Sequence, residues 1–280
     1  MSTEEADIGV EKQFHNHDDL DHAGKFAATL SAFSWRPERG FVADPSEPTG
    51  TVTFLEIEGK TYALTAEHVV DELEKFAKKS PGVALQGFFV PVGNGLPISG
   101  PFIVPPQDPA AKAAPDIAIC PVSRELIAAI GKEPFVVTAG NGLPGKISHG
   151  YAVGFPTGRK EDKAEPGGSR LAMQCVHALA EYSSDNVDLI RFVSEMSKPL
   201  LPGTRLSGMS GGPVFWSDGE TYGIAGFVIE AVDSEPDQSI YGDKVVQFVA
   251  QRADYETLCK WASYVDRNWQ SERDKLIRKG

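Results

Sequence analysis

The chain has 280 residues, of which 41% are hydrophobic, enough for one large domain or two small ones. Its formal net charge of −12 repels phosphate backbones and anionic lipid surfaces, so we expect neither a nucleic-acid nor a membrane partner. No apolar run reaches about 18 residues, the length that a membrane-spanning helix requires, so no such helix is predicted.

Residues 1–25 form a polar, acidic stretch that we predict to be a flexible N-terminal leader without the apolar segment of a secretory signal. The stretch contains a cluster of side chains of the kind that bind metals: His15, His17, Asp18, Asp19, Asp21 and His22. Because nothing here supplies a scaffold that fixes ligand geometry, we expect a solvated leader and no metal site. We also expect the chain to need no cofactor.

Three cysteines, Cys120, Cys175 and Cys259, are spread over the chain. An odd, sparse set of cysteines without a secretory signal indicates a reducing compartment. We therefore predict a cytoplasmic protein without structural disulfides, in which Cys120 is a small core residue.

The 28 glycines and 20 prolines lie between short apolar runs, which is typical of a turn-rich β protein. Six strands are predicted over residues 26–123: 26–35, 51–57, 61–65, 83–92, 98–104 and 117–122. The second and third form a hairpin that ends just before His68, and a short helix is expected at 69–78. Residues 26–123 thus form a first β unit.

A helical linker at 124–134 precedes a second β unit at 135–251. Its predicted strands are 135–138, 150–155, 171–182, 189–193, 213–216, 223–232 and 244–250. Residues 157–168 are polar and glycine-rich and predict an exposed loop. From 252 to 280 the apolar residues recur at helical spacing, which predicts a C-terminal helix. The fold class is therefore all-β with a terminal helix.

The segment Gly208 to Pro213, GMSGGP, places Ser210 among three glycines and ahead of an apolar strand. Glycine allows the backbone to turn tightly and to approach a substrate, and a serine needs a base and an anion site to act as a nucleophile. The segment also fits the G-x-S-x-G elbow of α/β-hydrolases. That fold requires a histidine after the serine, and all six histidines precede Ser210, so it is excluded.

Two further motifs complete a set. Residues 65–68, TAEH, end a predicted strand at His68, and residues 116–119, DIAI, open another at Asp116. Together with GMSGGP, these motifs and their order resemble the trypsin-like serine peptidases, over about residues 26–250. Asp108 lies near Asp116, but it is flanked by proline and lacks a following apolar strand, so we prefer Asp116.

The resemblance implies two six-stranded antiparallel Greek-key β-barrels, the chymotrypsin-like fold, with the C-terminal helix packed on the second. It implies a serine endopeptidase in which Ser210 is the nucleophile, His68 the general base and Asp116 the residue that orients His68. The backbone N–H groups of Gly208 and Ser210 would form the oxyanion hole. The partner would be a protein or peptide substrate.

By the same resemblance, the base of the specificity pocket is Thr204, and its wall is Ile229, Glu230 and Ala231. Thr204 carries no charge, so cleavage after Lys or Arg is not favoured unless Glu230 turns inward. His149 and His177 are expected to be structural, with His177 lining the pocket as the alternative.

Met209 stands where secreted trypsins have the aspartate that pairs with a newly cut N-terminus. The loop must then be held by packing, or by an activator protein or effector. The cytosolic signature of the sequence and the absence of a PDZ-like segment favour a regulated intracellular or defence-system protease. A catalytically inactive binding protein of the same fold and an esterase using the same three residues remain as alternatives.

Overall fold

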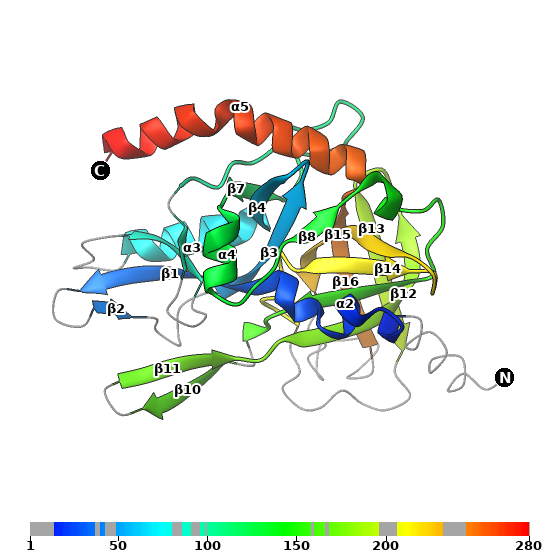
Figure 1. Cartoon of the computed structure of the whole chain (residues 1–280), viewed down its shortest axis with the longest axis horizontal. Coiled ribbons are helices and arrows are strands. Elements are labelled where there is room, and N and C mark those ends of the chain that lie inside the picture. Colours follow the sequence, from blue (N-terminus) through cyan, green and yellow to red (C-terminus); the bar gives the residue numbers. More distant parts are fainter. Residues whose placement is uncertain are drawn as a thin grey trace.

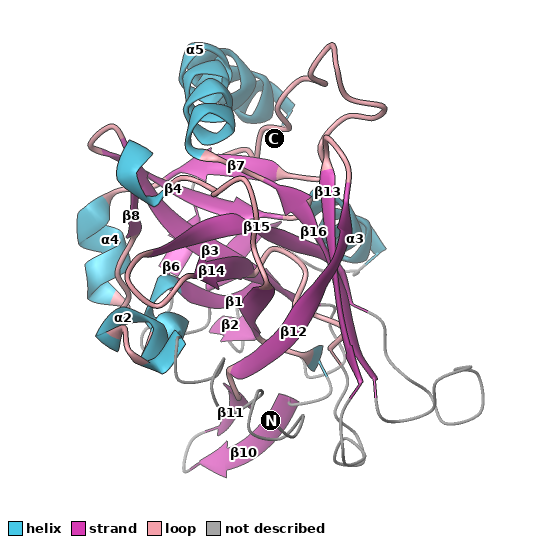
Figure 2. Cartoon of the chain, turned by 90° about the vertical axis from the view of Figure 1, so that its right-hand side faces the viewer, coloured by secondary structure: helices cyan, strands magenta, loops and turns pink. Residues whose placement is uncertain are grey.

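The computed structural model describes ten ranges of the chain: residues 14–36, 40–42, 49–79, 86–90, 96–98, 100–157, 160–165, 168–195, 206–231 and 245–279. These residues form two mainly antiparallel β units side by side, with a long helix across one end (Figures 1 and 2). Within the described ranges, no helix has both the length and the apolarity needed to cross a membrane.

The N-terminal unit is an eight-stranded sheet in which six strands follow the order β6-β5-β1-β3-β4-β7. Its strands are β1 (Ala27–Arg36), β2 (Gly40–Val42), β3 (Thr49–Ile57), β4 (Lys60–Thr65), β5 (Gln86–Val90), β6 (Leu96–Ile98), β7 (Ala118–Pro121) and β8 (Phe135–Val137). Glu58 and Gly59 turn the β3–β4 hairpin with positive φ angles of 51° and 77°. This tight turn returns β4 toward the site.

The C-terminal unit is a closed barrel of six strands in the order β12-β13-β16-β15-β14-β9. Its strands are β9 (His149–Gly154), β12 (Val176–Asp185), β13 (Leu189–Glu195), β14 (Pro213–Ser217), β15 (Tyr222–Ala231) and β16 (Val245–Arg252). Apolar side chains such as Phe192, Phe248 and Val214 fill its interior. The β-rich chain with a closed six-stranded barrel, a second sheet and a terminal helix matches the predicted chymotrypsin-like fold, in which both units were expected to be six-stranded barrels.

The N-terminal sheet differs from a closed six-stranded barrel. Among the described strands, its ladder ends at β6 and β7, and an isolated bridge between Ile103 and Ile119 extends the β7 edge. Strand β8 pairs in parallel with β3, so the strand expected to open the second unit belongs to the first. The barrel itself begins at β9, and Phe135 of β8 packs against Phe215 of the barrel at the boundary.

Residues 157–168 depart from the predicted loop, because part of them forms strand β10 (Lys160–Glu165). This strand pairs with β11 (Gly168–Met173) in a hairpin that projects away from both β units (Figures 1 and 2). The helices of the described residues are α2 (Asp18–Asp21), α3 (Glu67–Lys79), α4 (Arg124–Ala129) and α5 (Tyr255–Lys279), with short 3-10 turns η1 (Ala23–Phe26) and η2 (Ala139–Asn141).

The second part of the leader is packed, contrary to the expectation of a flexible segment. Phe14 and Leu20 are each 1% exposed, and the ring of Phe14 stacks on Tyr151 of β9 with centroids 5.3 Å apart. These residues join a core cluster that also contains Phe215 and Phe227 of the barrel and Leu64 of β4. The leader therefore helps to fill the space between the two units. Residues 1–13 lie outside the described residues.

Candidate active site

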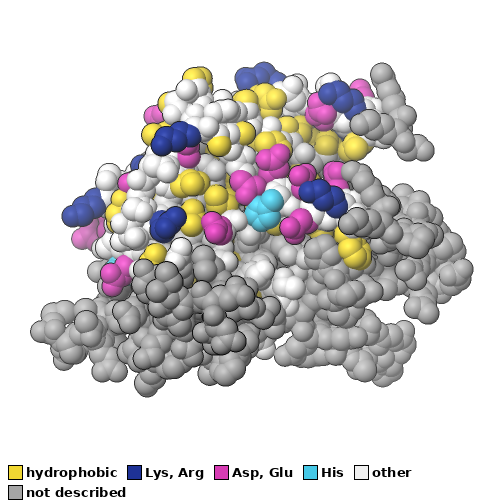
Figure 3. Space-filling model, turned by 180° about the vertical axis from the view of Figure 1, so that it is seen from behind, with side chains coloured by type: hydrophobic (Ala, Val, Ile, Leu, Met, Phe, Trp, Pro, Cys, Tyr) yellow, Lys and Arg dark blue, Asp and Glu magenta, His cyan; other side chains and the backbone are white. Residues whose placement is uncertain are grey.

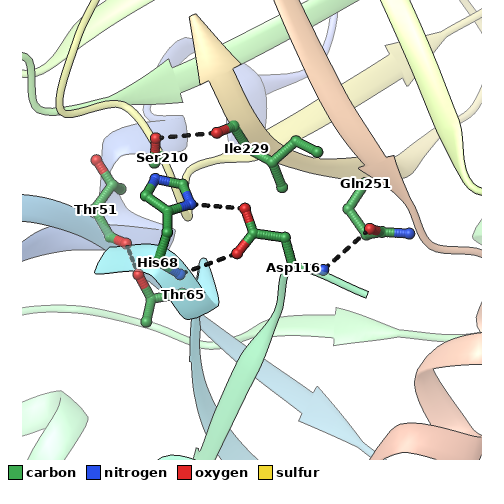
Figure 4. Close-up of polar contacts among 7 residues, drawn as sticks. All are labelled: Thr51, Thr65, His68, Asp116, Ser210, Ile229 and Gln251. Carbon is green, nitrogen blue, oxygen red and sulfur yellow. Dashed lines mark hydrogen bonds and ion pairs between the residues drawn. The ribbon is translucent and has the colours of Figure 1, made fainter. Parts of the chain in front are cut away.

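His68 and Asp116 meet because the strands that carry them are neighbours. His68 lies in the first turn of α3, directly after β4, and Asp116 precedes β7, which pairs antiparallel with β4. The Asp116 carboxylate accepts two hydrogen bonds from His68, from ring Nδ1 at 2.6 Å and from the backbone N at 3.0 Å. These two hydrogen bonds fix both the position and the orientation of the ring (Figure 4).

The pair is electrostatically coupled. The hydrogen bond to Asp116 raises the pKa of His68 above its usual value, and the charges of Asp71 and Glu72 act in the same direction. Burial alone would raise the pKa of Asp116, but the hydrogen bonds from His68 outweigh it and lower that pKa. Acidic side chains gather around a histidine on the face of the molecule shown in Figure 3. The arrangement favours an ionised carboxylate beside a basic imidazole.

Gln251 forms a hydrogen bond with the backbone of Asp116. This side chain on β16 is 6% exposed; its Oε1 accepts a hydrogen bond from Asp116 N at 3.3 Å, and its Nε2 donates to Asp188 O at 2.9 Å. Gln251 thereby connects the N-terminal sheet to the barrel at the site. Sequence reasoning missed this residue, because nothing in a strand pattern distinguishes one glutamine from another.

Ser210 lies on the turn that leads into β14. Figure 4 shows the His68 ring lying between Asp116 and Ser210. The Ser210 hydroxyl donates to Ile229 O at 3.5 Å, at the long limit of a hydrogen bond. Among the described residues, no hydrogen bond joins this hydroxyl to His68. The structure thus brings Ser210, His68 and Asp116 into one site from three separate elements.

The backbone around Ser210 leaves two N–H groups unpaired. Each carbonyl oxygen of residues 207–211 accepts a hydrogen bond of 2.7–2.9 Å; the donors in order are Thr157 N, the Thr51 hydroxyl, Gly212 N, Thr51 N and the Thr53 hydroxyl. Met209 N and Gly211 N donate to Leu206 and Val228. Within the described part of the chain, Gly208 N and Ser210 N have no acceptor. These are the two groups predicted for the oxyanion hole.

Gly208 and Gly211 give this turn its shape, with φ angles of +98° and +90° that other residues rarely adopt. A Cβ on Gly208 would also lie 2.7 Å from Thr157 N. Met209, between them, is 1% exposed and packs in the core of the barrel. Its side chain therefore anchors the turn by apolar contact rather than by charge.

The residues predicted to form the specificity pocket are only partly placed. Thr204 lies outside the described residues. Ile229 is half-buried and packs on the core cluster between the units, Ala231 packs on the barrel core, and Glu230 is exposed to solvent. The strand pairing shifts register between Val228 and Glu230, which marks a bulge beside Ser210.

The other candidates lie elsewhere. Asp108 is exposed and accepts a hydrogen bond from Ala110 N at 2.8 Å, so it caps its own loop. His177 on β12 hydrogen-bonds the Tyr151 hydroxyl. His149 opens β9. Cys120, Cys175 and Cys259 all have free thiols, and Cys120 is 1% exposed.

The leader histidines and acids that resembled metal ligands pair within the protein instead. His15 bonds Asp21, and His17 Nε2 lies 3.1 Å from Ser217 Oγ. Asp19 accepts hydrogen bonds from Tyr222 and, at 2.6 Å, from Lys25. These contacts tie the leader to the barrel. Among the described residues, no group of three or more His, Cys, Asp or Glu side chains could hold a metal ion.

No protein-family model matches the chain, and no curated protein does. Among solved structures, the chain is similar to the thermostable serine protease AL20 from an extremophilic microorganism, at 11% identity and a TM-score of 0.42, over 85% of this chain and 96% of that one. It is also similar to the protease Anisep from Arthrobacter nicotinovorans, at 14% identity, a TM-score of 0.44 and the same coverage.

A third similar structure is human heparin binding protein, at 11% identity and a TM-score of 0.44, over 87% of this chain and 92% of that one. With TM-scores below 0.5, these likenesses carry no weight in assigning an activity. The chain itself has the chymotrypsin-like arrangement of a mainly antiparallel sheet, a closed six-stranded barrel and a C-terminal helix, with its candidate site where the two β units meet.

Proposed function

We propose that the chain is a serine endopeptidase that hydrolyses peptide bonds through an acyl-enzyme intermediate. The observation that supports this best is the grouping around Ser210: a hydrogen-bonded His68–Asp116 pair on one side and two unpaired backbone N–H groups in its own turn. A nucleophile needs a base and an anion site, and this grouping offers both.

In the proposed reaction, the Ser210 hydroxyl first leaves Ile229 O, which costs little because that bond is long. Its oxygen then attacks the substrate carbonyl carbon, and its proton passes to His68 Nε2. Asp116 holds the proton on Nδ1, so Nε2 is the nitrogen left free to accept, and the carboxylate stabilises the imidazolium that forms.

Collapse of the tetrahedral intermediate breaks the C–N bond, and His68 gives its proton to the leaving amine. Water, deprotonated by His68, then hydrolyses the acyl-enzyme by the same steps in reverse order. During both stages the negative oxygen would accept hydrogen bonds from Gly208 N and Ser210 N. One such donor lowers the barrier by about 2.7–4 kcal/mol.

The substrate in this proposal is a protein or peptide, with Thr204 at the base of the pocket and Ile229, Glu230 and Ala231 along its wall. The exposed side chain of Glu230 supports a pocket without an inward negative charge. Three free thiols support action in a reducing, cytoplasmic compartment. Regulation by an activator or effector belongs to the same proposal.

The test compares the wild type with Ser210→Ala and with a control, Ser184→Ala, whose side chain is exposed on β12. We expect the wild type and the control to react with a fluorophosphonate probe and to cleave a mixed peptide library. We expect Ser210→Ala to do neither while keeping its melting temperature. Equal turnover by Ser210→Ala would refute the proposal.

Two other results would each select an alternative. Turnover of simple esters with no cleavage of any peptide would indicate an esterase on the same three residues. A folded wild type in which Ser210 reacts with no probe would indicate a binding protein that has lost catalysis.

A further inference from the structure

The turn that carries the predicted oxyanion hole is held by hydrogen bonds from a residue of the other β unit. Thr51, on β3 of the N-terminal sheet, is 0% exposed and contacts the Ser210 turn with both its side chain and its backbone. Its hydroxyl donates to Gly208 O at 2.9 Å, and its backbone N donates to Ser210 O at 2.9 Å. One residue thus holds the carbonyls of both residues whose N–H groups remain unpaired.

The Thr51 hydroxyl is itself fully satisfied. It accepts a hydrogen bond from Phe155 N at 3.0 Å while donating to Gly208. The backbone carbonyl of Thr51 accepts a hydrogen bond from the Thr65 hydroxyl at 2.7 Å, and Thr65 ends the strand that leads to His68. Figure 4 shows the bond between Thr51 and Thr65 beside the His68 ring. The Ser210 turn is therefore held, through Thr51, by β4, the same strand that positions His68.

We infer that Thr51 is the positioning residue that keeps the oxyanion turn in its working geometry, in place of a charged N-terminus. The inference rests on the proposed function. The peptide between Gly208 and Met209 lies between the two free donors, and its carbonyl is held by the Thr51 hydroxyl. Because glycine has a less restricted backbone than other residues, loss of that bond lets the Gly208 carbonyl rotate toward the hole.

Met209 and Thr51 both hold the Ser210 turn in place, by different contacts. The Met209 side chain anchors the turn in the barrel core, and Thr51, from the neighbouring unit, holds the carbonyls of Gly208 and Ser210. Together they require no new N-terminal ammonium. The turn is then competent without an N-terminal cleavage, provided that the two units stay packed together.

The test replaces Thr51 with Val, which keeps the shape of the side chain and removes the hydroxyl. Thr51→Ser, which restores a hydroxyl, should rescue. The matched control is Thr29→Val: Thr29 is opposite Thr51 in the β1–β3 ladder and 3% exposed, but its hydroxyl donates to Met173 Sδ, at 3.3 Å, and to no atom of the Ser210 turn. We measure kcat and KM on a cleaved peptide, and the affinity for a peptidyl trifluoromethyl ketone, which forms an oxyanion on Ser210.

We expect Thr51→Val to lower kcat and the ketone affinity by the same factor, about tenfold or more, because a lost oxyanion donor costs about 10²–10³ and a misplaced one part of that. The KM and the pH of the acid limb should not move, since the His68–Asp116 pair is untouched. Thr51→Ser and Thr29→Val should stay within about threefold of the wild type, well below the effect of a lost donor.

Undiminished kcat in folded Thr51→Val, with the wild type active and Ser210→Ala inactive, would overturn this inference and leave the proposed function standing. A crystal structure provides a readout that needs no turnover. If the Gly208 carbonyl keeps its orientation and Gly208 keeps its positive φ in Thr51→Val, the inference is also overturned. If Thr51→Val does not fold, Thr51→Ala, which removes the branched side chain, is put through the same measurements.

Discussion

The backbone N of Asp116 donates to Oε1 of Gln251 at 3.3 Å, across the boundary between the two β units. The carboxylate of Asp116 is fixed by His68, and its main chain is fixed by a strand of the barrel. Two residues separated by 135 positions in the chain thus determine where the base of the proposed reaction lies.

Gln251→Leu should lower kcat/KM by about tenfold and the free energy of unfolding by about 1–3 kcal/mol. The change leaves Asp116 N without this acceptor and removes one of the two hydrogen bonds that Asp188 O accepts, the other coming from Arg252 N. An unsatisfied, partly buried donor costs about that much. The control is Gln247→Leu, on the same strand and half-buried, which should change kcat/KM by less than about threefold. Steady-state kinetics and urea unfolding measure both effects. A loss of stability with unchanged kcat/KM would mean that Gln251 has no role in positioning Asp116.

The activity should fall in acid as His68 becomes protonated. His68 must be neutral to accept the Ser210 proton, and its hydrogen bond to Asp116 raises its pKa above the usual value of about 6.5. The acid limb of kcat/KM is therefore expected at a pH above 6.5. In Asp116→Asn the raising contribution is gone, so the limb should move to lower pH, while the maximal rate falls by about 10⁴-fold because the ring takes the wrong tautomer.

Full pH profiles of kcat/KM for the wild type, Asp116→Asn and Asp108→Asn measure this shift. Asp108→Asn is the control, because Asp108 is exposed and caps its own loop. An unmoved acid limb in Asp116→Asn, or a large loss of kcat/KM in Asp108→Asn, would show that Asp116 is not the partner of His68.

The sequence predicted the features that depend on neighbouring residues. The β3–β4 hairpin, the helix after it and the glycine turn around Ser210 are local, because each is determined by turn residues or a short apolar period. Thr51 and Gln251 were not predicted, since both lie on ordinary strands and act on residues more than a hundred positions away. Strand β8 was assigned to the wrong unit because three apolar residues do not indicate which sheet they join.

The leader was mispredicted for a related reason. Its average composition is acidic, and composition is what indicates disorder. Two isolated apolar side chains, Phe14 and Leu20, nevertheless fill a space between the units that only the folded protein creates. Their burial depends on Tyr151 and other distant residues. No hydrophobic periodicity within the segment indicates that Phe14 and Leu20 are buried.

The last prediction concerns the contribution of this segment to stability. Phe14 is 1% exposed, and its ring stacks on Tyr151, so Phe14→Ala should lower the free energy of unfolding by about 3–5 kcal/mol, the usual cost of emptying a buried aromatic site. Asn16→Ala is the control, because Asn16 is exposed on the same segment and should change the free energy by less than about 0.5 kcal/mol.

Urea unfolding followed by intrinsic fluorescence measures the free energy, and peptide turnover per folded molecule measures competence. We expect turnover within about threefold of the wild type in both variants, since Phe14 stacks on Tyr151 in the cluster between the units, whereas Met209 of the Ser210 turn packs in the separate barrel core. Wild-type stability in Phe14→Ala would show that the leader is not docked in solution. A large rise in turnover would show instead that the docked leader restrains the enzyme.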